Sequence, residues 1–366
     1  MNPENFTRRR FLSTISTASA LAMHPQHVFA EKPAGKKLGV ALVGLGRYST
    51  GQLGPALKLT TDCRLAAVVT SSPEKGKKWA AEYGFPESHI YNYETMAQMA
   101  DNPDIDIVYV VTPNALHAPH TIAAAKAGKH VICEKPMATS VKDCDAMIAA
   151  CKSAKVQLAI GYRSHYEPCA IELKRLAKTA EIGTFTKIDG GFSFVMKKPE
   201  WRIQKSLAGG GPLMDLGIYV IQSHFMAAGD VMPIAITARE LPKQRPDFFT
   251  DVEETIEWEM EFPNGLRGTA RTSYNQGRNE FRAESATGWY HITSAYGYQG
   301  HQAKSHLGPF SFTALPSIQA AQMDAFARHV RDGSPNQTPG EMGRRDLVVV
   351  EAIYASAAGK PVKLAF

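Results

Sequence analysis

Along the first part of the chain, short apolar runs alternate with segments of helical periodicity. The apolar runs have the length of buried strands and occupy Leu38–Val43, Leu65–Val69, Ile107–Val111, His130–Cys133 and Gln157–Ile160. Helical patterns lie between them at Pro73–Tyr83, Pro119–Ala127 and Val141–Ala154. This alternation predicts an α/β, Rossmann-type domain over residues 37–160, with helices on both faces of a doubly wound parallel sheet.

Beyond about residue 160, the pattern changes to strands in which apolar and polar residues alternate. One helix is predicted near Pro168–Lys178, and alternating runs follow at Phe185–Phe194, Ile234–Glu240, Thr255–Phe262, Leu266–Ser273 and Phe281–Glu284. Asn264-Gly265 and Thr287-Gly288 have the composition of hairpin turns, and helical patterns at Ser317–Arg331 and Gly340–Ala358 close the chain. Residues 161–366 are therefore predicted to form an α+β domain with a large, mostly antiparallel sheet, whose C-terminal helices can return to the first domain.

The first 30 residues are predicted to be an export signal rather than part of the fold. Arg8-Arg9-Arg10 precede Phe11-Leu12 and a mildly apolar run to Met23, and the small residue Ala30 stands at the end. This order is typical of the twin-arginine route, so we expect the twin-arginine export machinery as a partner and the periplasm as the location. The run is too short and too polar for a membrane span of roughly 20 residues, which argues against membrane anchoring. The alternative is a basic amphipathic or disordered tail.

Composition excludes several classes of function. The formal net charge is +6 over 366 residues, and the basic residues are scattered along the chain, so we expect no nucleic-acid partner. The five cysteines include no C-x-x-C pair, which predicts neither an obligatory disulfide nor a metal site. With 44% apolar residues, the chain can bury the cores of two domains.

A glycine turn follows the first predicted strand. Gly44 and Gly46 permit the tight turn and the close backbone approach that a pyrophosphate at a helix N-terminus requires. Ser49 takes the third position of the fingerprint and the next glycine is Gly51, so the pattern departs from G-x-G-x-x-G. We expect a dinucleotide-binding turn, with an ordinary strand-to-helix turn as the alternative.

The end of the second predicted strand indicates which dinucleotide binds. An NAD-binding domain usually has Asp or Glu there, but this chain has Thr70-Ser71-Ser72, followed by Lys75. Hydroxyls with the cation of Lys75 or Arg47 suit the 2′-phosphate of NADP, because charge-assisted hydrogen bonds favour a phosphate. The alternative is a solvated helix start without a ligand.

Three reactive side chains are predicted to meet at the nicotinamide end of such a cofactor. Thr112–His117 and Cys133–Pro136 end neighbouring strands, and the second segment carries Lys135. Asp215 and Tyr219 follow in a glycine-rich segment. Oxidation of a sugar hydroxyl needs a base, and a tyrosine, with an ordinary pKa near 10, needs a neighbouring cation to act as one. Lys135 and Tyr219 therefore indicate hydride transfer on a carbohydrate. The alternative places Tyr219 in the core and Asp215 at a helix cap.

These motifs resemble those of the Gfo/Idh/MocA family of sugar oxidoreductases, and in particular its glucose-fructose and aldose-aldose oxidoreductase type. The resemblance runs from about residue 38 to the end and rests on Gly44–Tyr48, Thr112–Asn114, Cys133–Ser140, Gly161–Arg163, Trp201-Arg202 and Gly209–Tyr219. It implies tightly bound NADP, a ping-pong cycle, and catalytic roles for Lys135, Tyr219 and Asp215, the last as a sugar ligand. Ser49 and the Thr70-Ser71-Ser72 run depart from the family pattern. These departures affect the residues expected at the adenosine end of the cofactor and not those at the nicotinamide end, where the reaction takes place.

The resemblance and the strand-end motifs together give the predicted binding residues. For the cofactor these are Gly44, Gly46, Arg47, Tyr48, Thr70, Ser71, Lys75, Tyr93, Thr112, Pro113, Asn114, His117, Glu134, Lys135, Arg163, Trp201 and Arg202. For the substrate they are Lys135, Arg163, His165, Asp215 and Tyr219. Phe192, Phe194 and Trp258 are expected to pack within the sheet instead.

We therefore expect an enzyme that oxidises an aldose at C1 to its lactone and reduces a second sugar to a polyol with one bound NADP. Tight binding also follows from the export route, because nicotinamide dinucleotides are made in the cytoplasm and a protein exported in the folded state must carry its cofactor. The alternatives are a sugar dehydrogenase with exchangeable NAD(P) and a non-catalytic dinucleotide or sugar sensor. We also expect a homodimer or homotetramer, because alternation predicts a second sheet face that is partly apolar.

Overall fold

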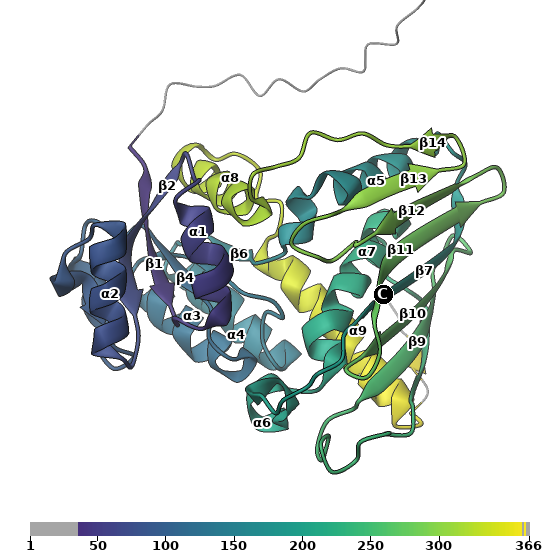
Figure 1. Cartoon of the computed structure of the whole chain (residues 1–366), viewed down its shortest axis with the longest axis horizontal. Coiled ribbons are helices and arrows are strands. Elements are labelled where there is room, and N and C mark those ends of the chain that lie inside the picture. The colour runs from purple at the N-terminus through teal and green to yellow at the C-terminus, as the bar shows by residue number, and fades with distance from the viewer. Residues whose placement is uncertain (1–35, 361, 364–366) are drawn as a thin grey trace, which may run out of the picture. The chain divides into compact units, whose positions relative to one another are not determined.

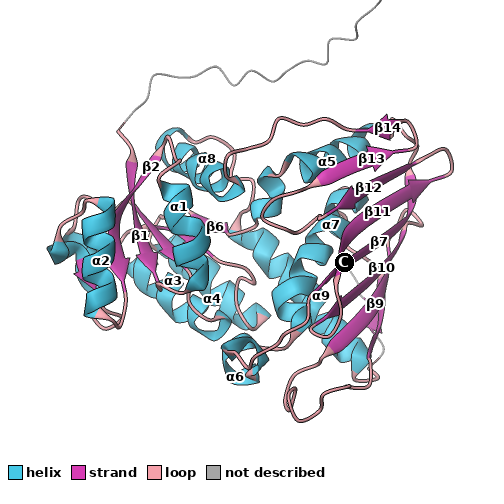
Figure 2. Ribbon diagram, viewed as in Figure 1, coloured by secondary structure: helices cyan, strands magenta, loops and turns pink. Residues whose placement is uncertain are grey.

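The computed structural model describes residues 36–360 and 362–363, so the predicted export signal at residues 1–30 lies outside the described residues. The described part of the chain contains a six-stranded sheet and a nine-stranded sheet, with helices packed on both (Figures 1 and 2). The predicted fold class, a Rossmann-type parallel sheet followed by a mostly antiparallel sheet, is confirmed.

The six-stranded sheet is parallel throughout. Its strands are, in spatial order, β3 (Ile90–Tyr91), β2 (Cys63–Val69), β1 (Leu38–Val43), β4 (Ile107–Val110), β5 (His130–Cys133) and β6 (Leu158–Ile160). The connecting helices are α1 (Gly54–Leu57), α2 (Pro73–Tyr83), α3 (His117–Lys126) and α4 (Val141–Ser153). Residues Val40–Val43 are fully buried, because helices cover both faces of the central strand. The strand order reverses between β1 and β4, which opens a crevice at the carboxyl ends of these strands.

Helix α2 shows how the local sequence sets an element's limits. The Ser72 hydroxyl accepts a hydrogen bond from the backbone N–H of Lys75, Pro73 occupies the first turn, and Gly84 ends the helix with a φ of 74°. The helix-start interpretation of the Thr70-Ser71-Ser72 run therefore holds for Ser72, whereas Thr70 and Ser71 precede the cap.

The nine-stranded sheet has the order β14-β13-β12-β11-β7-β10-β9-β8-β15, and its neighbouring strands are antiparallel except for β7 and β10. The strands are β7 (Phe185–Ser193), β8 (Ala235–Glu240), β9 (Thr255–Glu261), β10 (Arg267–Ser273), β11 (Arg278–Ser285), β12 (Trp289–Thr293), β13 (Gln302–Ser305), β14 (Gly308–Pro309) and β15 (Val362–Lys363). The predicted turns at Asn264-Gly265 and Thr287-Gly288 join β9 to β10 and β11 to β12.

Five further helices of the described chain, α5 to α9, pack on or between the two sheets. Helix α7 (Ile218–Ala228) is buried along its whole length, because it packs on β7 and against α5 (Pro168–Thr179) and α9 (Gly340–Ala357) (Figure 1). Helix α9 also contacts α4 and β6, and α8 (Ile318–Asp332) contacts α1 and β2. The last two long helices thus return to the parallel sheet. The short helix α6 (Lys205–Ala208) contacts the turn at Asn114–Leu116.

The second face of the large sheet corrects one expectation. Its outward side chains are not apolar: they form rows of paired charges, such as Arg239 with Glu257 and, at 2.5 Å, Arg282 with Glu284. Trp289 is the aromatic exception, and the Arg282 guanidinium lies over its ring. On the described strands, the outward positions carry mostly charged or polar side chains, such as Lys187, Thr237 and Glu259, and not the partly apolar face that was expected.

The five cysteines are buried and free. Within the described residues, no group of three His, Cys, Asp or Glu side chains is placed to hold a metal ion. No helix in that part of the chain is long and apolar enough to cross a membrane.

Candidate active site

A cavity of about 530 Å³ lies where the carboxyl edge of the parallel sheet faces helix α7 and loops of the large sheet. From the parallel sheet and its loops, the lining residues are Arg47, Tyr48, Gln52, Val111, Thr112, Asn114, His117, Glu134, Lys135 and Arg163. From the second half of the chain, they are Phe192, Phe194, Glu200, Trp201, Arg202, Asp215, Leu216, Tyr219, Tyr296, Gly297 and Tyr298. The fold thus brings together predicted site residues that are far apart in sequence.

The glycine turn after β1 has the geometry that a dinucleotide phosphate requires. Gly44 has a φ of 100°, and a Cβ there would lie 3.0 Å from the carbonyl oxygen of Val111, so glycine is needed. A Cβ on Gly46 would meet no atom within 4 Å, which leaves the turn open. The Ser49 hydroxyl donates to the Gly44 carbonyl at 2.6 Å. Ser49 therefore closes the turn itself, which gives the departure from the fingerprint a structural role.

The predicted adenosine-end residues lie together at the edge of the parallel sheet. Thr70 ends β2, and its N–H donates to the carbonyl of Tyr91 in β3. Ser71 and Lys75 are exposed beside it. Tyr93 follows β3 and stacks on His120, with ring centroids 5.1 Å apart. These side chains surround the start of α2, outside the 530 Å³ cavity.

His117 fixes two strand-end turns to each other. Its Nδ1 lies 2.8 Å from the carbonyl oxygen of Pro136, and its Nε2 lies 2.8 Å from that of Thr112. Burial lowers the pKa of His117 to about 4, so the ring is neutral at physiological pH. Both nitrogens contact the backbone, and the ring therefore supports the cavity wall. Pro113 lies between the lining residues Thr112 and Asn114.

Asp215 is a largely buried carboxylate, with its side chain 14% exposed, and it binds two cations. Its Oδ1 accepts a hydrogen bond from Lys135 Nζ at 3.2 Å, and its backbone carbonyl accepts another from the same Nζ at 2.8 Å. Its Oδ2 accepts from the Tyr274 hydroxyl at 3.0 Å and lies 3.1 Å from Arg202 Nε. Burial favours the neutral acid, but the two cations outweigh it and lower the pKa of Asp215 to about 2.

Lys135 is therefore a fixed cation rather than a base. Burial by itself would lower its pKa, but the charges of Tyr219, Asp215 and Glu134 raise the pKa above the usual lysine value. Its Nζ lies 4.8 Å from the centroid of the Tyr219 ring.

Tyr219 lies in the first turn of α7 and lines the cavity. Arg163 Nε donates a hydrogen bond to its hydroxyl at 3.3 Å. Phe192 packs edge-on against its ring, with centroids 5.5 Å apart. Asp215 lies in a π-helical turn that runs into α7, and its side chain caps no helix. The geometry thus differs from the alternative in its capping aspartate, whereas Tyr219 is buried among core residues and also lines the cavity.

The glycine-rich segment before Asp215 is held by a carboxylate that the sequence analysis missed. Glu253 accepts hydrogen bonds from the N–H groups of Gly211 at 2.9 Å and Leu213 at 3.0 Å, and from the Tyr354 hydroxyl at 2.9 Å. A Cβ on Gly210 would lie 2.0 Å from that hydroxyl, so only glycine fits. The sequence feature that could have identified Glu253 is the acidic pair Glu253-Glu254 at the start of a buried strand. Buried carboxylates need specific partners, so such a pair predicts a structural contact.

Charged residues of one loop join both halves of the site. Glu200 pairs with Arg47 at the start of the first helix and accepts from Arg202 Nη1 at 3.1 Å. The Arg202 guanidinium also lies over the ring of Trp201, 4.7 Å from its centroid. Trp201 and Arg202 line the cavity as predicted binding residues should, and Glu200 is an addition that the sequence did not suggest.

The structure does not bring His165 to the cavity. Its ring is buried beside Gln222, and burial lowers the pKa of His165 to about 4. Phe192 and Phe194, expected only to pack within the sheet, instead line the cavity, whereas Trp258 is a core residue. Strand alternation predicts which face of the sheet each aromatic side chain occupies. It does not predict whether that part of the face is covered by other side chains or borders a cavity.

Comparisons with known proteins agree with this architecture. A family model described as "Oxidoreductase family, NAD-binding Rossmann fold" matches residues 38–162, and one described as "GFO/IDH/MocA C-terminal domain" matches residues 170–293. The solved structure of an aldose-aldose oxidoreductase from Caulobacter crescentus, complexed with glycerol, is 41% identical, covers 90% of this chain and 100% of its own, and has a TM-score of 0.87.

Two further relatives are more distant. A D-xylose 1-dehydrogenase [NADP(+)] from Haloarcula marismortui is 28% identical over 338 residues, which is 88% of this chain and 92% of the relative. A levoglucosan dehydrogenase in complex with NADH and levoglucosan is 22% identical, covers 90% of this chain and all of its own, with a TM-score of 0.78, and supports the fold alone.

Proposed function

The chain belongs to the Gfo/Idh/MocA oxidoreductase family, as its motifs predicted, and on this premise we propose that it oxidises an aldose at C1 to the lactone and returns the hydride to a second sugar. In this proposal one NADP stays bound through both half-reactions. The observation that carries it is the placement of Lys135, Asp215 and Tyr219 around one cavity at the carboxyl edge of the parallel sheet.

The residues present fit a bound NADP. The open turn at Gly44 and Gly46 suits the pyrophosphate, and Thr70, Ser71 and Lys75 offer hydroxyls and a cation for the 2′-phosphate. Bound NADP supplies the nicotinamide that accepts and returns the hydride. The ion pair between Arg47 and Glu200 joins the glycine turn to the loop that carries Trp201, which supports slow release of the dinucleotide.

The protein's own groups handle the proton and the sugar. Tyr219 takes the proton of the C1 hydroxyl in the oxidation and gives it to the carbonyl oxygen of the second sugar in the reduction. Asp215 keeps Lys135 charged and in place, and its carboxylate can accept a hydrogen bond from a sugar hydroxyl. Phe192, Tyr296 and the stacked Trp201 exclude water from the reacting end.

A second candidate function is a sugar dehydrogenase with exchangeable NAD(P). The relative named D-xylose 1-dehydrogenase [NADP(+)] favours it, because that name describes a single oxidation with NADP. A non-catalytic sensor on the same fold is disfavoured by the Lys135, Asp215 and Tyr219 cluster, which a binding module would not need.

Absorbance of the purified, dialysed protein separates these functions. If NADP is retained, adding glucose should produce the band of reduced nicotinamide without added cofactor, and a second sugar should remove that band. A band that appears only after NADP is added would identify a dehydrogenase with exchangeable cofactor. Binding of NADP without any band in the presence of aldoses would contradict both enzymes and indicate a sensor.

A further inference from the structure

Arg163 is a buried cation whose contacts go beyond a binding role. Its side chain, in the turn after β6, is only 2% exposed. Nη1 donates to the carbonyl of Gly297 and Nη2 to that of Tyr296, each at 2.6 Å. The third donor, Nε, bonds to the hydroxyl of Tyr219 at 3.3 Å. The two carbonyls fix the plane of the guanidinium and aim its Nε–H at the tyrosine oxygen.

The two cations near Tyr219 therefore act differently. Both lie over the Tyr219 ring, with Lys135 Nζ 4.8 Å and Arg163 Cζ 4.9 Å from its centroid. Lys135 donates its hydrogen bonds to Asp215, whereas Arg163 also donates one to the Tyr219 oxygen itself. A guanidinium has no acceptor, so the hydroxyl of Tyr219 must be the acceptor in this bond. The hydrogen of that hydroxyl thus stays available for a substrate oxygen in the cavity.

We propose that Arg163 stabilises the tyrosinate form of Tyr219 and is a further catalytic residue, an inference that rests on the proposed function. In the oxidation, the C1–H bond breaks and its electron pair leaves as hydride to the nicotinamide. The O–H bond of the C1 hydroxyl breaks, its proton forms the O–H of Tyr219, and C1–O becomes C=O. In the reduction the same proton passes to the carbonyl oxygen of the second sugar. Tyrosinate is present before the first step and after the second, and a preorganised donor on its oxygen stabilises it.

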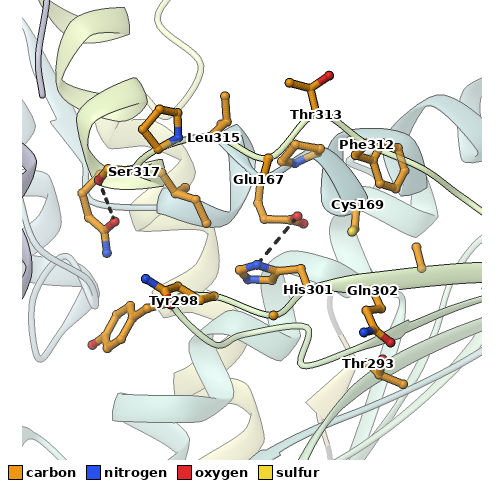
Figure 3. A pocket seen from close by; sticks show the side chains of 18 of the residues that line it. Glu167, Cys169, Thr293, Tyr298, His301, Gln302, Phe312, Thr313, Leu315 and Ser317 are labelled. Carbon is orange, nitrogen blue, oxygen red and sulfur yellow. Dashed lines mark hydrogen bonds and ion pairs between the residues drawn. The ribbon is translucent and has the colours of Figure 1, made fainter.

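His301 and Glu167 lie next to the Gly297 carbonyl that binds Arg163. The carbonyl of Gly297 lies 3.1 Å from His301 Nε2, and His301 Nδ1 lies 4.0 Å from Glu167 Oε1. Figure 3 shows this pair at the wall of an adjoining cavity of about 940 Å³, which shares Gln52 and Tyr298 with the candidate site. Glu167 is itself fixed, because it accepts a hydrogen bond from the N–H of Ala170 at 2.9 Å. His301 acts on Tyr219 only through Gly297 and Arg163 and is a positioning residue.

The test needs two readouts, and the first is the half-reaction. Removal of a donor to a developing anion commonly costs about 10²- to 10³-fold in rate. In Arg163→Ala, single-turnover reduction of bound NADP by glucose, measured at full NADP loading, should slow by about 10²-fold. Dilute guanidinium should restore part of the rate, and Arg163→Lys should keep part of it. Loss of NADP with a normal rate after reloading would overturn the proposal, because Arg163 would then be only a cofactor ligand.

Arg278→Met is the matched control. This arginine is half-buried on the outward face of β11, pairs with Asp189, and does not line the cavity. Its loss should leave the half-reaction unchanged, with no response to guanidinium. Equal acceleration of both variants by guanidinium would show a general salt effect, and the recovery of Arg163→Ala would then not support the proposal.

The second readout needs no sugar. The ultraviolet band of the Tyr219 tyrosinate is obtained as the difference between the parent and Tyr219→Phe over a pH series. The ionisable groups around this ring are Lys135, Asp215, Glu134, Tyr48, Tyr298 and Arg163. Loss of one adjacent cation should move the appearance of the band upward by at least about 1 pH unit in Arg163→Ala. His301→Ala should move it in the same direction by less.

An unchanged titration in Arg163→Ala would overturn the proposal even if the enzyme is active. A shifted titration in a protein that no aldose reduces would support the role of Arg163 and count against the proposed function alone. The two failures are therefore distinguishable.

Discussion

At the scale of single residues, ion pairs between charged side chains fix the positions and the charge states of the groups that line the cavity. Asp215 lies between Lys135 and Arg202, so its carboxylate stays ionised in spite of its burial. Because Lys135 is kept charged, we propose that Tyr219 is the side chain that exchanges a proton with the sugar.

Removal of the Tyr219 hydroxyl tests that assignment directly. Tyr219→Phe keeps the ring and its packing on Phe192, so the bound NADP should be unaffected. Turnover should fall by about 10²- to 10⁴-fold, the usual contribution of a positioned acid or base. The measurement is steady-state turnover with glucose as donor. A turnover rate near that of the parent would contradict the assignment and would show that Tyr219 has only a structural role.

The charge on Asp215 makes a prediction about stability and pH. The folded-state pKa of Asp215 is lowered from 3.8 to about 2, so its ion pairs stabilise the native state at neutral pH. As the pH falls from about 4 to about 2, the carboxyl is protonated first in the unfolded and then in the native state, and this stabilisation is lost. The shift corresponds to about 2 kcal/mol.

Urea unfolding of the parent and Asp215→Asn at neutral and acidic pH measures this effect. At neutral pH the parent should exceed Asp215→Asn in free energy of unfolding. That difference between the two proteins should become smaller by about 2 kcal/mol as the pH is lowered to about 2, because the parent loses its charged Asp215. Asp145→Asn, at an exposed ion pair with Arg344, is the control and should change much less. A difference that stays constant with pH would argue against a buried charge on Asp215.

At the scale of elements, we propose that the end of β2 and the start of α2 decide which dinucleotide binds. Ser72 is used as the helix cap, so Thr70, Ser71 and the exposed Lys75 are left for a phosphate. Lys75→Ala should lower NADP affinity by roughly 10- to 150-fold, the range for one charge-assisted hydrogen bond, and leave NAD affinity nearly unchanged.

Cofactor titration of the unloaded protein would measure both affinities. Lys78→Ala, at another exposed position of the same helix, is the matched control and should change neither. Equal losses for NADP and NAD in Lys75→Ala would show that Lys75 supports the fold and does not contact the 2′-phosphate.

At the scale of the whole molecule, the outward face of the large sheet suggests how two copies could associate. Arg278, Glu280, Arg282 and Glu284 alternate in sign along β11. A twofold axis across this row would place arginines opposite glutamates, so we propose a homodimer through this face. Light scattering at micromolar concentration should show a dimer that weakens with salt and in Glu280→Arg. Glu74→Arg on α2 should have no effect, and a monomeric parent would contradict the proposal.

Export is a prediction about the whole chain, because the signal predicted at residues 1–30 would deliver a protein already folded around its cofactor. Arg8→Lys together with Arg9→Lys should leave precursor in the cytoplasm, as judged by cell fractionation. An Arg10→Lys variant outside the paired arginines serves as the comparison. Unchanged periplasmic yield of the double variant would contradict the twin-arginine assignment.

The sequence by itself determined the two sheets and the location of the site. Continuous apolar runs at β1, β4 and β5 require burial on both faces, and alternating runs at β9 and β10 require one covered face, so local periodicity is enough to predict each strand. Motifs at strand ends, such as the one that carries Lys135, must meet because parallel strands share a carboxyl edge.

Only the tertiary structure decided which atoms meet inside that site. Arg163 and Tyr219 lie 56 residues apart, and the hydrogen bond between them depends on how α7 packs against the turn after β6. The same packing turns His165 away from the cavity and brings Phe192 into it. Glu253 reaches Gly211 across 42 residues for the same reason. Periodicity assigns a residue to a face, but its partner on another element is set by the packing and register of segments distant in sequence.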